Sequence, residues 1–130
     1  MIKDIPRPEI EDVLLAVVKY QEEDWKVYLL NRRDDILQNV MITSRGYGKK
    51  EGQEQKTSTL RHMFPQLEPK EYALIEPMDV SVFHLNNEYW VSYFINKQLY
   101  DKKYIFVPDS IKDENLVYIK ELDQKGVLHR

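Results

Sequence analysis

The sequence predicts an all-β domain, built as one antiparallel β-sandwich over residues 1–130. Its apolar residues occur in short runs rich in β-branched and aromatic side chains, with turn signals roughly every ten residues, which is typical of sandwiches. The clearest pair of runs covers 87–95 and 99–107, joined by only three residues. A small barrel has a similar pattern and is the alternative architecture.

The runs 87–95 and 99–107 predict a hairpin at the centre of the fold. Successive side chains of a strand point to opposite faces, and both faces of 87–95 carry apolar bulk, with Tyr93 on one face and Trp90 on the other. This pattern predicts a central strand that is covered on both sides. The connection lacks glycine, but Asn96 is one of the few residues that tolerate the left-handed conformation common in such turns.

Two further strands are predicted in the first part of the chain. Residues 1–11 contain two prolines, which favour an extended lead-in. The apolar run 13–20 is rich in valine, which favours a strand, although the acidic residues before it leave a helix over 8–20 as an alternative. The alternating segment 25–31 follows a charged turn and predicts the hairpin partner of 13–20.

The middle of the chain predicts three more elements and one long loop. Strands are expected over 37–45, 56–64 and 72–76, the second of them only half apolar, as at the edge of a sheet. The segment 46–55 holds three of the four glycines together with several charges, which predicts a mobile loop. The segment 78–85 fits either a strand or a helical turn.

The end of the chain is predicted to be mostly irregular. Residues 108–115 predict a short C-terminal helical turn with Ser110 as its cap. A last short strand is expected over 116–119, and 124–130 is expected to be a tail.

Composition excludes several classes of protein. The chain has no cysteine, so it has no disulfide and no thiolate metal site. The net charge of −3 gives no overall attraction to nucleic acid or to an anionic membrane. The first residues contain no apolar signal region, and the longest apolar run, 13–18, is six residues, far shorter than a membrane span. We expect a cytoplasmic protein without a membrane segment.

One motif points to nucleic acid. The sequence Arg45-Gly46-Tyr47-Gly48 matches the opening of an RNA-binding fingerprint whose aromatic residues stack on bases. Lys49 and Lys50 stand where the fingerprint requires an aromatic and an aliphatic residue, so the match ends there. The candidate binding residues of this segment are therefore Arg45, Tyr47, Lys49 and Lys50.

The polar segment 56–62 adds Arg61 and His62 as candidate binding residues. Ser58 and His62 are four residues apart on a predicted strand, about 13 Å, too far for the hydrogen bond of a nucleophile and its base. The histidines lack metal-ligand spacing, and no phosphate-binding glycine loop is present. We predict no catalytic site, no metal and no cofactor; an unfamiliar site formed by Arg61, His62 and Glu88 is the enzyme alternative.

Two resemblances bear on fold and function. The segments 28–31 and 37–42, with a polar turn between them, are similar to strand pairs of immunoglobulin-like and adaptor-appendage sandwiches. A second resemblance rests on the segments VYLLN (27–31), SRGYG (44–48), KTSTLRH (56–62), IEP (75–77), LNNEYWVS (85–92) and YDKKYIF (100–106). With these segments, along nearly its whole length, the chain resembles a family of short uncharacterised bacterial proteins, whose members often bear the label phenylalanyl-tRNA synthetase subunit. It implies a compact domain and no defined activity.

The sequence therefore predicts an immunoglobulin-like sandwich that acts as a non-catalytic interaction module, with a protein partner or a second copy of itself. The nine tyrosines favour this hypothesis, because aromatic residues are enriched in contact surfaces. An RNA- or tRNA-associated accessory domain is the alternative, and it would use the segment around Tyr47.

Overall fold

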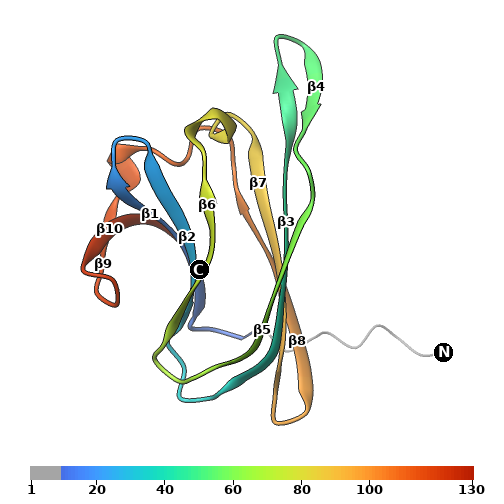
Figure 1. The fold of residues 1–130 in the computed structure, drawn as a ribbon, viewed down its shortest axis with the longest axis vertical. Helices are drawn as coiled ribbons and strands as arrows, with labels where there is room; N and C mark the ends of the chain where they lie inside the picture. The colour runs from blue at the N-terminus through green and yellow to red at the C-terminus, as the bar shows by residue number, and fades with distance from the viewer. Residues whose placement is uncertain (1–9) are drawn as a thin grey trace, which may run out of the picture.

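The computed structural model describes residues 10–130, which form two antiparallel sheets packed face to face (Figure 1). Sheet A has the strand order β6-β2-β1-β10-β9. Its strands are β1 (Val13–Gln21), β2 (Asp24–Asn31), β6 (Tyr72–Met78), β9 (Val117–Ile119) and β10 (Gln124–His129). The predicted all-β antiparallel sandwich is confirmed.

Sheet B is built around one long strand, β3, whose two halves have different partners at the same edge. β5 pairs with the first half of β3, β4 pairs with the second half, and β7 and β8 follow on the other side. Its strands are β3 (Leu37–Lys50), β4 (Gln53–Lys56), β5 (Leu60–Leu67), β7 (Asn86–Ile95) and β8 (Gln98–Phe106). The predicted central hairpin is β7–β8.

The main core lies between the sheets and follows the period of two that strands impose. On β1 the side chains of Val13, Leu15 and Val17 point into it, and on β7 those of Val91 and Tyr93 do. Segment β1 contains three valines, whose β-branched side chains favour a strand, and the chain forms a strand here and not the alternative helix.

Two buried tyrosines in this core differ in their hydrogen bonding. The hydroxyl of Tyr104 donates to the carbonyl of Val13, whereas the hydroxyl of Tyr93 has no partner within residues 10–130. Tyr104→Phe is expected to lower the free energy of unfolding by about 1 kcal/mol, since it leaves a buried carbonyl without its donor. Tyr93→Phe is expected to change it by less than about 0.5 kcal/mol, because only an unsatisfied hydroxyl is lost. Urea denaturation of both variants checks this; equal losses would contradict it.

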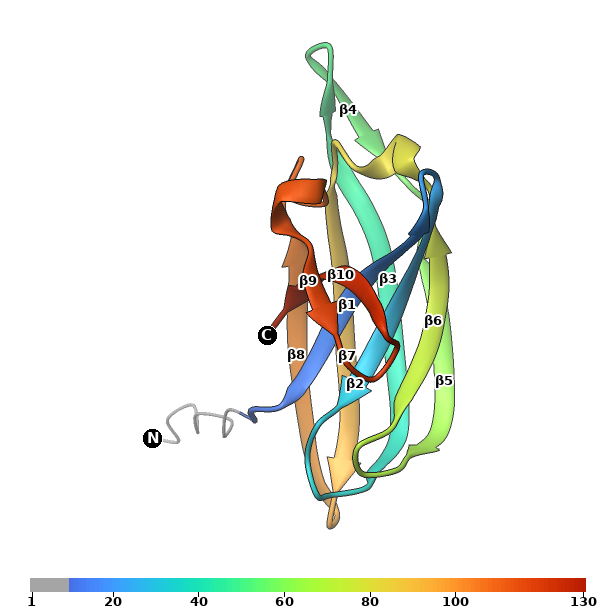
Figure 2. The same cartoon turned by 90° about the vertical axis from the view of Figure 1, so that its left-hand side faces the viewer.

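A second apolar cluster covers the outer face of sheet A. The hairpin of β9 and β10 curls across β1 and β2, as the two perpendicular views show (Figures 1 and 2). Ile119 of this hairpin is fully buried against Leu14, Ala16 and Leu30. The prediction of a tail over 124–130 is therefore wrong: β10 pairs with β1 and its residues cover apolar surface that would otherwise be exposed.

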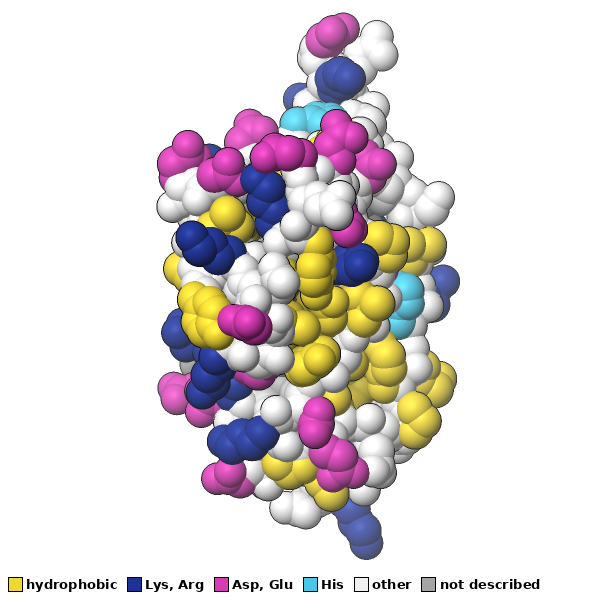
Figure 3. Space-filling model, turned by 60° about the vertical axis from the view of Figure 1, so that its left-hand side comes forward, with side chains coloured by type: hydrophobic (Ala, Val, Ile, Leu, Met, Phe, Trp, Pro, Cys, Tyr) yellow, Lys and Arg dark blue, Asp and Glu magenta, His cyan; other side chains and the backbone are white. Residues whose placement is uncertain are grey.

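The cover over sheet A is incomplete at its edge strand. Figure 3 shows hydrophobic side chains gathered on this side of the molecule. On β6, Tyr72 and Leu74 remain exposed, and the Tyr72 ring makes an edge contact with Tyr28.

Two other sequence expectations are corrected, and one open alternative is resolved. The segment 46–55 is a β-hairpin and not a mobile loop, because β3 continues to Lys50 and pairs with β4. Strand β5 starts at Leu60, later than the predicted 56–64, but it is an edge strand as expected. The ambiguous 78–85 contains the 3-10 helix η1 (Val80–Val82).

The helical turn expected over 108–115 takes a different form. A 3-10 helix, η2 (Asp113–Asn115), begins after Lys112, with no side-chain cap. Ser110 donates its hydroxyl to the Val107 carbonyl instead of capping the turn. The lead-in predicted over 1–11 lies almost entirely outside the described residues.

Candidate functional site

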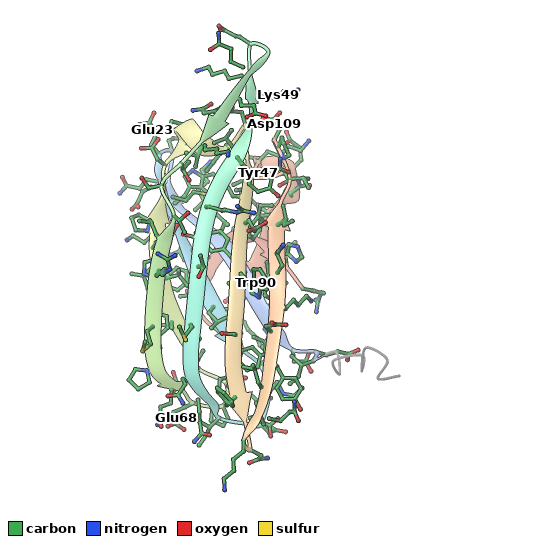
Figure 4. The ribbon with its side chains drawn as sticks, turned by 90° about the vertical axis from the view of Figure 1, so that its right-hand side faces the viewer. Glu23, Tyr47, Lys49, Glu68, Trp90 and Asp109 are labelled. Carbon is green, nitrogen blue, oxygen red and sulfur yellow. The ribbon has the colours of Figure 1, made fainter. Side chains whose placement is uncertain are left out.

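The outer surface of sheet B is a broad face that no other element of residues 10–130 covers (Figure 4). We define it by the side chains of β3, β4, β5, β7 and β8 that alternate with the inward-facing residues of these strands. Its apolar members include Met41, Met63, Trp90 and Leu99, which are between 41% and 69% exposed. Trp90 stands near the middle of this face. Large apolar side chains on a sheet face are usually buried, so this exposure needs an explanation.

An ion-pair cluster lies beside Trp90 on the same surface. The carboxylate of Glu88, which is buried beneath its neighbours, accepts from Arg45 Nε at 2.8 Å and lies 3.9 Å from Lys103 Nζ. The hydrogen bond and the charge of Glu88 raise the pKa of Arg45. Two cations on one carboxylate leave this cluster with a net positive charge.

The same two cations also lie over aromatic rings. The Arg45 guanidinium is 5.2 Å from the centre of the Tyr47 ring, and Lys103 Nζ is 4.8 Å from the Trp90 ring. Such cation–π contacts hold the aromatic rings and the charges in one layer. The surface therefore combines exposed aromatic area with positive charge across β3, β7 and β8.

The structure brings four of the six predicted binding residues together. Arg45, Tyr47 and Lys49 alternate along β3 and Arg61 pairs beside them on β5, so all four lie on the outer surface of sheet B. The other two do not join them. Lys50 follows Lys49 on the opposite face of β3, and His62 points to the space between the sheets.

His62 belongs to a polar cluster between the sheets, centred on Glu76 of β6. His62 Nε2 lies 2.7 Å from Glu76 Oε1, and Ser44 Oγ donates to the same oxygen at 2.8 Å. The Tyr89 hydroxyl donates to Glu76 Oε2 at 3.1 Å. Burial and the nearby Glu76 raise the pKa of Tyr89 well above its usual value, so this hydroxyl keeps its proton and remains a donor.

The enzyme alternative required Arg61, His62 and Glu88 to converge. They do not: Arg61 and Glu88 lie on the outer surface, whereas His62 faces inward and bonds Glu76. Ser44 and His62 both contact the carboxylate and not each other, so the geometry of a nucleophile activated by a base is absent from this cluster. Within residues 10–130 no group of three potential metal ligands occurs.

A pocket of about 310 Å³ opens next to the Glu76 cluster. Its walls come from β3, the segment after β4, the end of β6 and the start of β7. The inward positions of β3 become small here, at Ser44 and Gly46, where earlier positions carry Val40 and Ile42. The hollow therefore follows from the sequence of β3.

Sequence reasoning missed the importance of Trp90, Lys103 and Glu76. The apolar bulk on both faces of 87–95 predicted a strand covered on both sides, but the Trp90 side is open. A signal was present: Lys103 in the partner strand pairs directly with Trp90, and a lysine opposite an aromatic residue indicates a solvated face. Glu76 could not be found, because its partners are distant in sequence.

No family model, curated protein or solved structure matches this chain. The resemblance to the family of short bacterial proteins stays a prediction. In the part of the chain that the structure describes, no helix has the length and apolar character needed to cross a membrane.

Proposed function

We propose that this protein is a non-catalytic interaction module that docks a protein partner on the outer surface of sheet B. The observation that carries the proposal is the exposure of Trp90, Met41 and Met63 on a sheet face that the other described elements leave open. Tryptophan and methionine are enriched in protein interfaces, and tryptophan is prominent among residues that dominate binding energy.

The charges around this apolar centre indicate what the partner carries. The outer surface has more basic than acidic side chains: Arg45, Lys49, Lys56, Arg61 and Lys103 against Glu54, Glu88 and Asp101. Complementarity across an interface favours opposite charges at the rim. The partner we propose is therefore a protein segment with aromatic or aliphatic residues flanked by aspartate or glutamate.

Selection from a displayed random-peptide library tests this proposal. We expect enrichment of peptides with an apolar core and acidic flanks, and we expect Trp90→Ala to weaken their binding by about tenfold, since a buried aromatic anchor is lost. The matched control is Tyr72→Ala, an exposed aromatic residue on the outer face of sheet A. Fluorescence anisotropy of the selected peptides measures both variants.

Two outcomes would overturn the proposal, and a third would change the identity of the partner. Peptides whose binding depends on Tyr72 and not on Trp90 would place docking on sheet A. Enrichment of basic peptides would contradict the charge argument. Concentration-dependent dimerisation in sedimentation, abolished by Trp90→Ala, would make the occupant a second copy of this chain.

A second candidate function is binding of single-stranded RNA. It is favoured by the placement of Arg45, Tyr47, Lys49 and Arg61 on one face together with Trp90, because aromatic rings and cations on a sheet form a stacking platform for bases. A fluorescent oligouridine tests it. RNA binding would weaken steeply between 50 and 200 mM salt, by about a hundredfold or more if several phosphates are contacted, whereas docking of an apolar peptide would change little.

Two finer predictions accompany the proposal. The immunoglobulin-like type of the sandwich and a cytoplasmic location rest on the sequence alone. Both stay predictions.

A further inference from the structure

The pocket beside Glu76 is separate from the docking surface proposed above. Arg45 contributes to its wall, but the guanidinium of Arg45 lies on the outer surface, bonded to Glu88. The charged side chains that remain around the pocket are Glu76 and Asp79, both acidic. Leu60, Pro77 and Met78 supply apolar wall. The volume of about 310 Å³ is at the lower end of the range for small-ligand sites.

Neither carboxylate forms an ion pair with a lysine or arginine of the described residues. Within residues 10–130, the ion-pair partner of Glu76 is His62 alone, and Asp79 makes no ion pair. Asp79 instead accepts from the backbone N–H of Ser81, which lowers its pKa and keeps it ionised. The Glu76 side chain is 13% exposed, and its ion-pair partner His62 is a cation only when it is protonated.

The pocket also has spare hydrogen-bond acceptors. A carboxylate offers about four acceptor positions, and Glu76 uses three of them for Ser44, His62 and Tyr89. Asn87, which is 6% exposed, donates Nδ2 to the carbonyls of Val82 and Leu85 at 2.9 and 3.2 Å. Its Oδ1 therefore points away from those carbonyls and accepts no hydrogen bond from the described part of the chain.

We propose that this pocket binds a primary ammonium group on a short alkyl stem, either a free amine or a lysine side chain. An ammonium group has three N–H donors and no acceptor, which matches a site of carboxylate and amide oxygens. Glu76 and Asp79 supply the counter-charge, Asn87 Oδ1 supplies a further acceptor, and the apolar wall formed by Leu60, Pro77 and Met78 contacts the methylene stem.

Titration of the isotope-labelled protein with n-butylammonium, followed by amide chemical shifts, tests this inference. We expect saturable shifts at Ser44, Gly46 and Tyr89, with a dissociation constant of about 1 mM for so small a ligand. The neutral isostere n-butanol should leave these amides unshifted at the same concentrations. A second arm uses Nα-acetyl-lysine methylamide: its binding would assign a lysine side chain, and its failure beside a positive n-butylammonium result would assign a free amine.

Matched variants separate the site from the fold. Glu76→Gln is expected to weaken n-butylammonium binding at least tenfold, and Asp79→Asn about threefold. Because asparagine is also a good N-cap, Asp79→Asn preserves the hydrogen bond to Ser81 and keeps the test valid if Glu76→Gln destabilises the domain. The control is Glu68→Gln, an exposed carboxylate at the opposite end of sheet B from Tyr47 (Figure 4).

Three results would overturn the proposal: no shift with either amine, equal shifts with n-butanol, or unchanged affinity in both acidic variants. None of them depends on Trp90, so a failure here is distinguishable from a failure of the docking proposal.

Discussion

Replacing Gly126 by alanine is expected to lower the free energy of unfolding by about 2 to 3 kcal/mol, through steric overlap with strand β1. Gly126 lies in β10, opposite Val18 of β1. A Cβ atom at this position would lie 2.8 Å from the Val17 carbonyl oxygen and 3.1 Å from Val18 Cα. Both are backbone atoms, so no side-chain rotation can relieve the contact, and β10 must move away from β1.

The displacement should also loosen the cover on sheet A. Hydrogen exchange of the Val127 and Leu128 amides is expected to accelerate more than that of the β7 amides. The comparison variant is Gly52→Ala, whose Cβ would meet nothing within 4 Å but whose φ of +79° disfavours alanine. We expect it to cost about 1 kcal/mol and to leave exchange in β10 unchanged. Guanidinium denaturation of Gly126→Ala with the wild-type midpoint would contradict the packing described here.

The sequence predicted most strands because period-two alternation is local information. The strands β1, β2, β7 and β8 were placed within one or two residues, since each combines β-branched or aromatic residues with polar turns at its ends. β10 was missed because its sequence, QKGVLH, contains only two consecutive apolar residues, and its stability comes from the long-range pairing with β1. Pairing between strands that are distant in the chain cannot be recognised from the sequence of either strand alone.

The hairpin of β3 and β4 was mistaken for a loop for a related reason. Glycines and charges usually indicate turns, but Gly46 and Gly48 lie within strand β3. A Cβ atom at Gly46 would lie 3.0 Å from Thr57 Cγ2, and one at Gly48 would lie 3.2 Å from Leu85 Cδ2, both closer than ordinary van der Waals contact. The glycines mark close packing, which composition cannot distinguish from flexibility.

The candidate site could likewise be predicted only in part from the sequence. Arg45, Tyr47 and Lys49 could be predicted to share a face, because residues two apart on a strand always do. Adding Arg61 and Trp90 required the pairings of β3 with β5 and β7, which only the structure provides. The Glu76 cluster draws on β3, β5, β6 and β7, so it depends wholly on tertiary structure.

Replacing Glu121 by glutamine is expected to cost about 1 to 3 kcal/mol of unfolding free energy at pH 7, because it breaks a charge-assisted pair that secures the C-terminal hairpin. Arg32, next to the end of β2, donates Nε to Glu121 Oε2 at 2.8 Å and Nη2 to Oε1 at 3.1 Å. The Glu121 side chain is 10% exposed, so solvent screens this pair only weakly.

The cost of Glu121→Gln should depend on pH in a defined direction. Burial alone would raise the pKa of Glu121, but the hydrogen bonds to its carboxylate and the positive charges of Arg32 and Lys120 together outweigh burial, so the pKa is lowered. A carboxyl whose pKa is lower in the folded state stabilises the fold above its unfolded value of about 4.3, and this contribution is lost as pH falls through the folded value. The difference in stability between wild type and variant is therefore expected to be full at pH 7 and to shrink below about pH 4.

Urea denaturation from pH 7 to pH 3 measures this difference. The control is Glu114→Gln in η2, an exposed carboxylate for which we expect a change below about 0.5 kcal/mol throughout. A difference for Glu121→Gln that stays constant down to pH 3 would show that the carboxylate charge does not secure the hairpin. The expected decline would show that one partly buried ion pair, between residues 89 positions apart in the chain, holds the cover over sheet A.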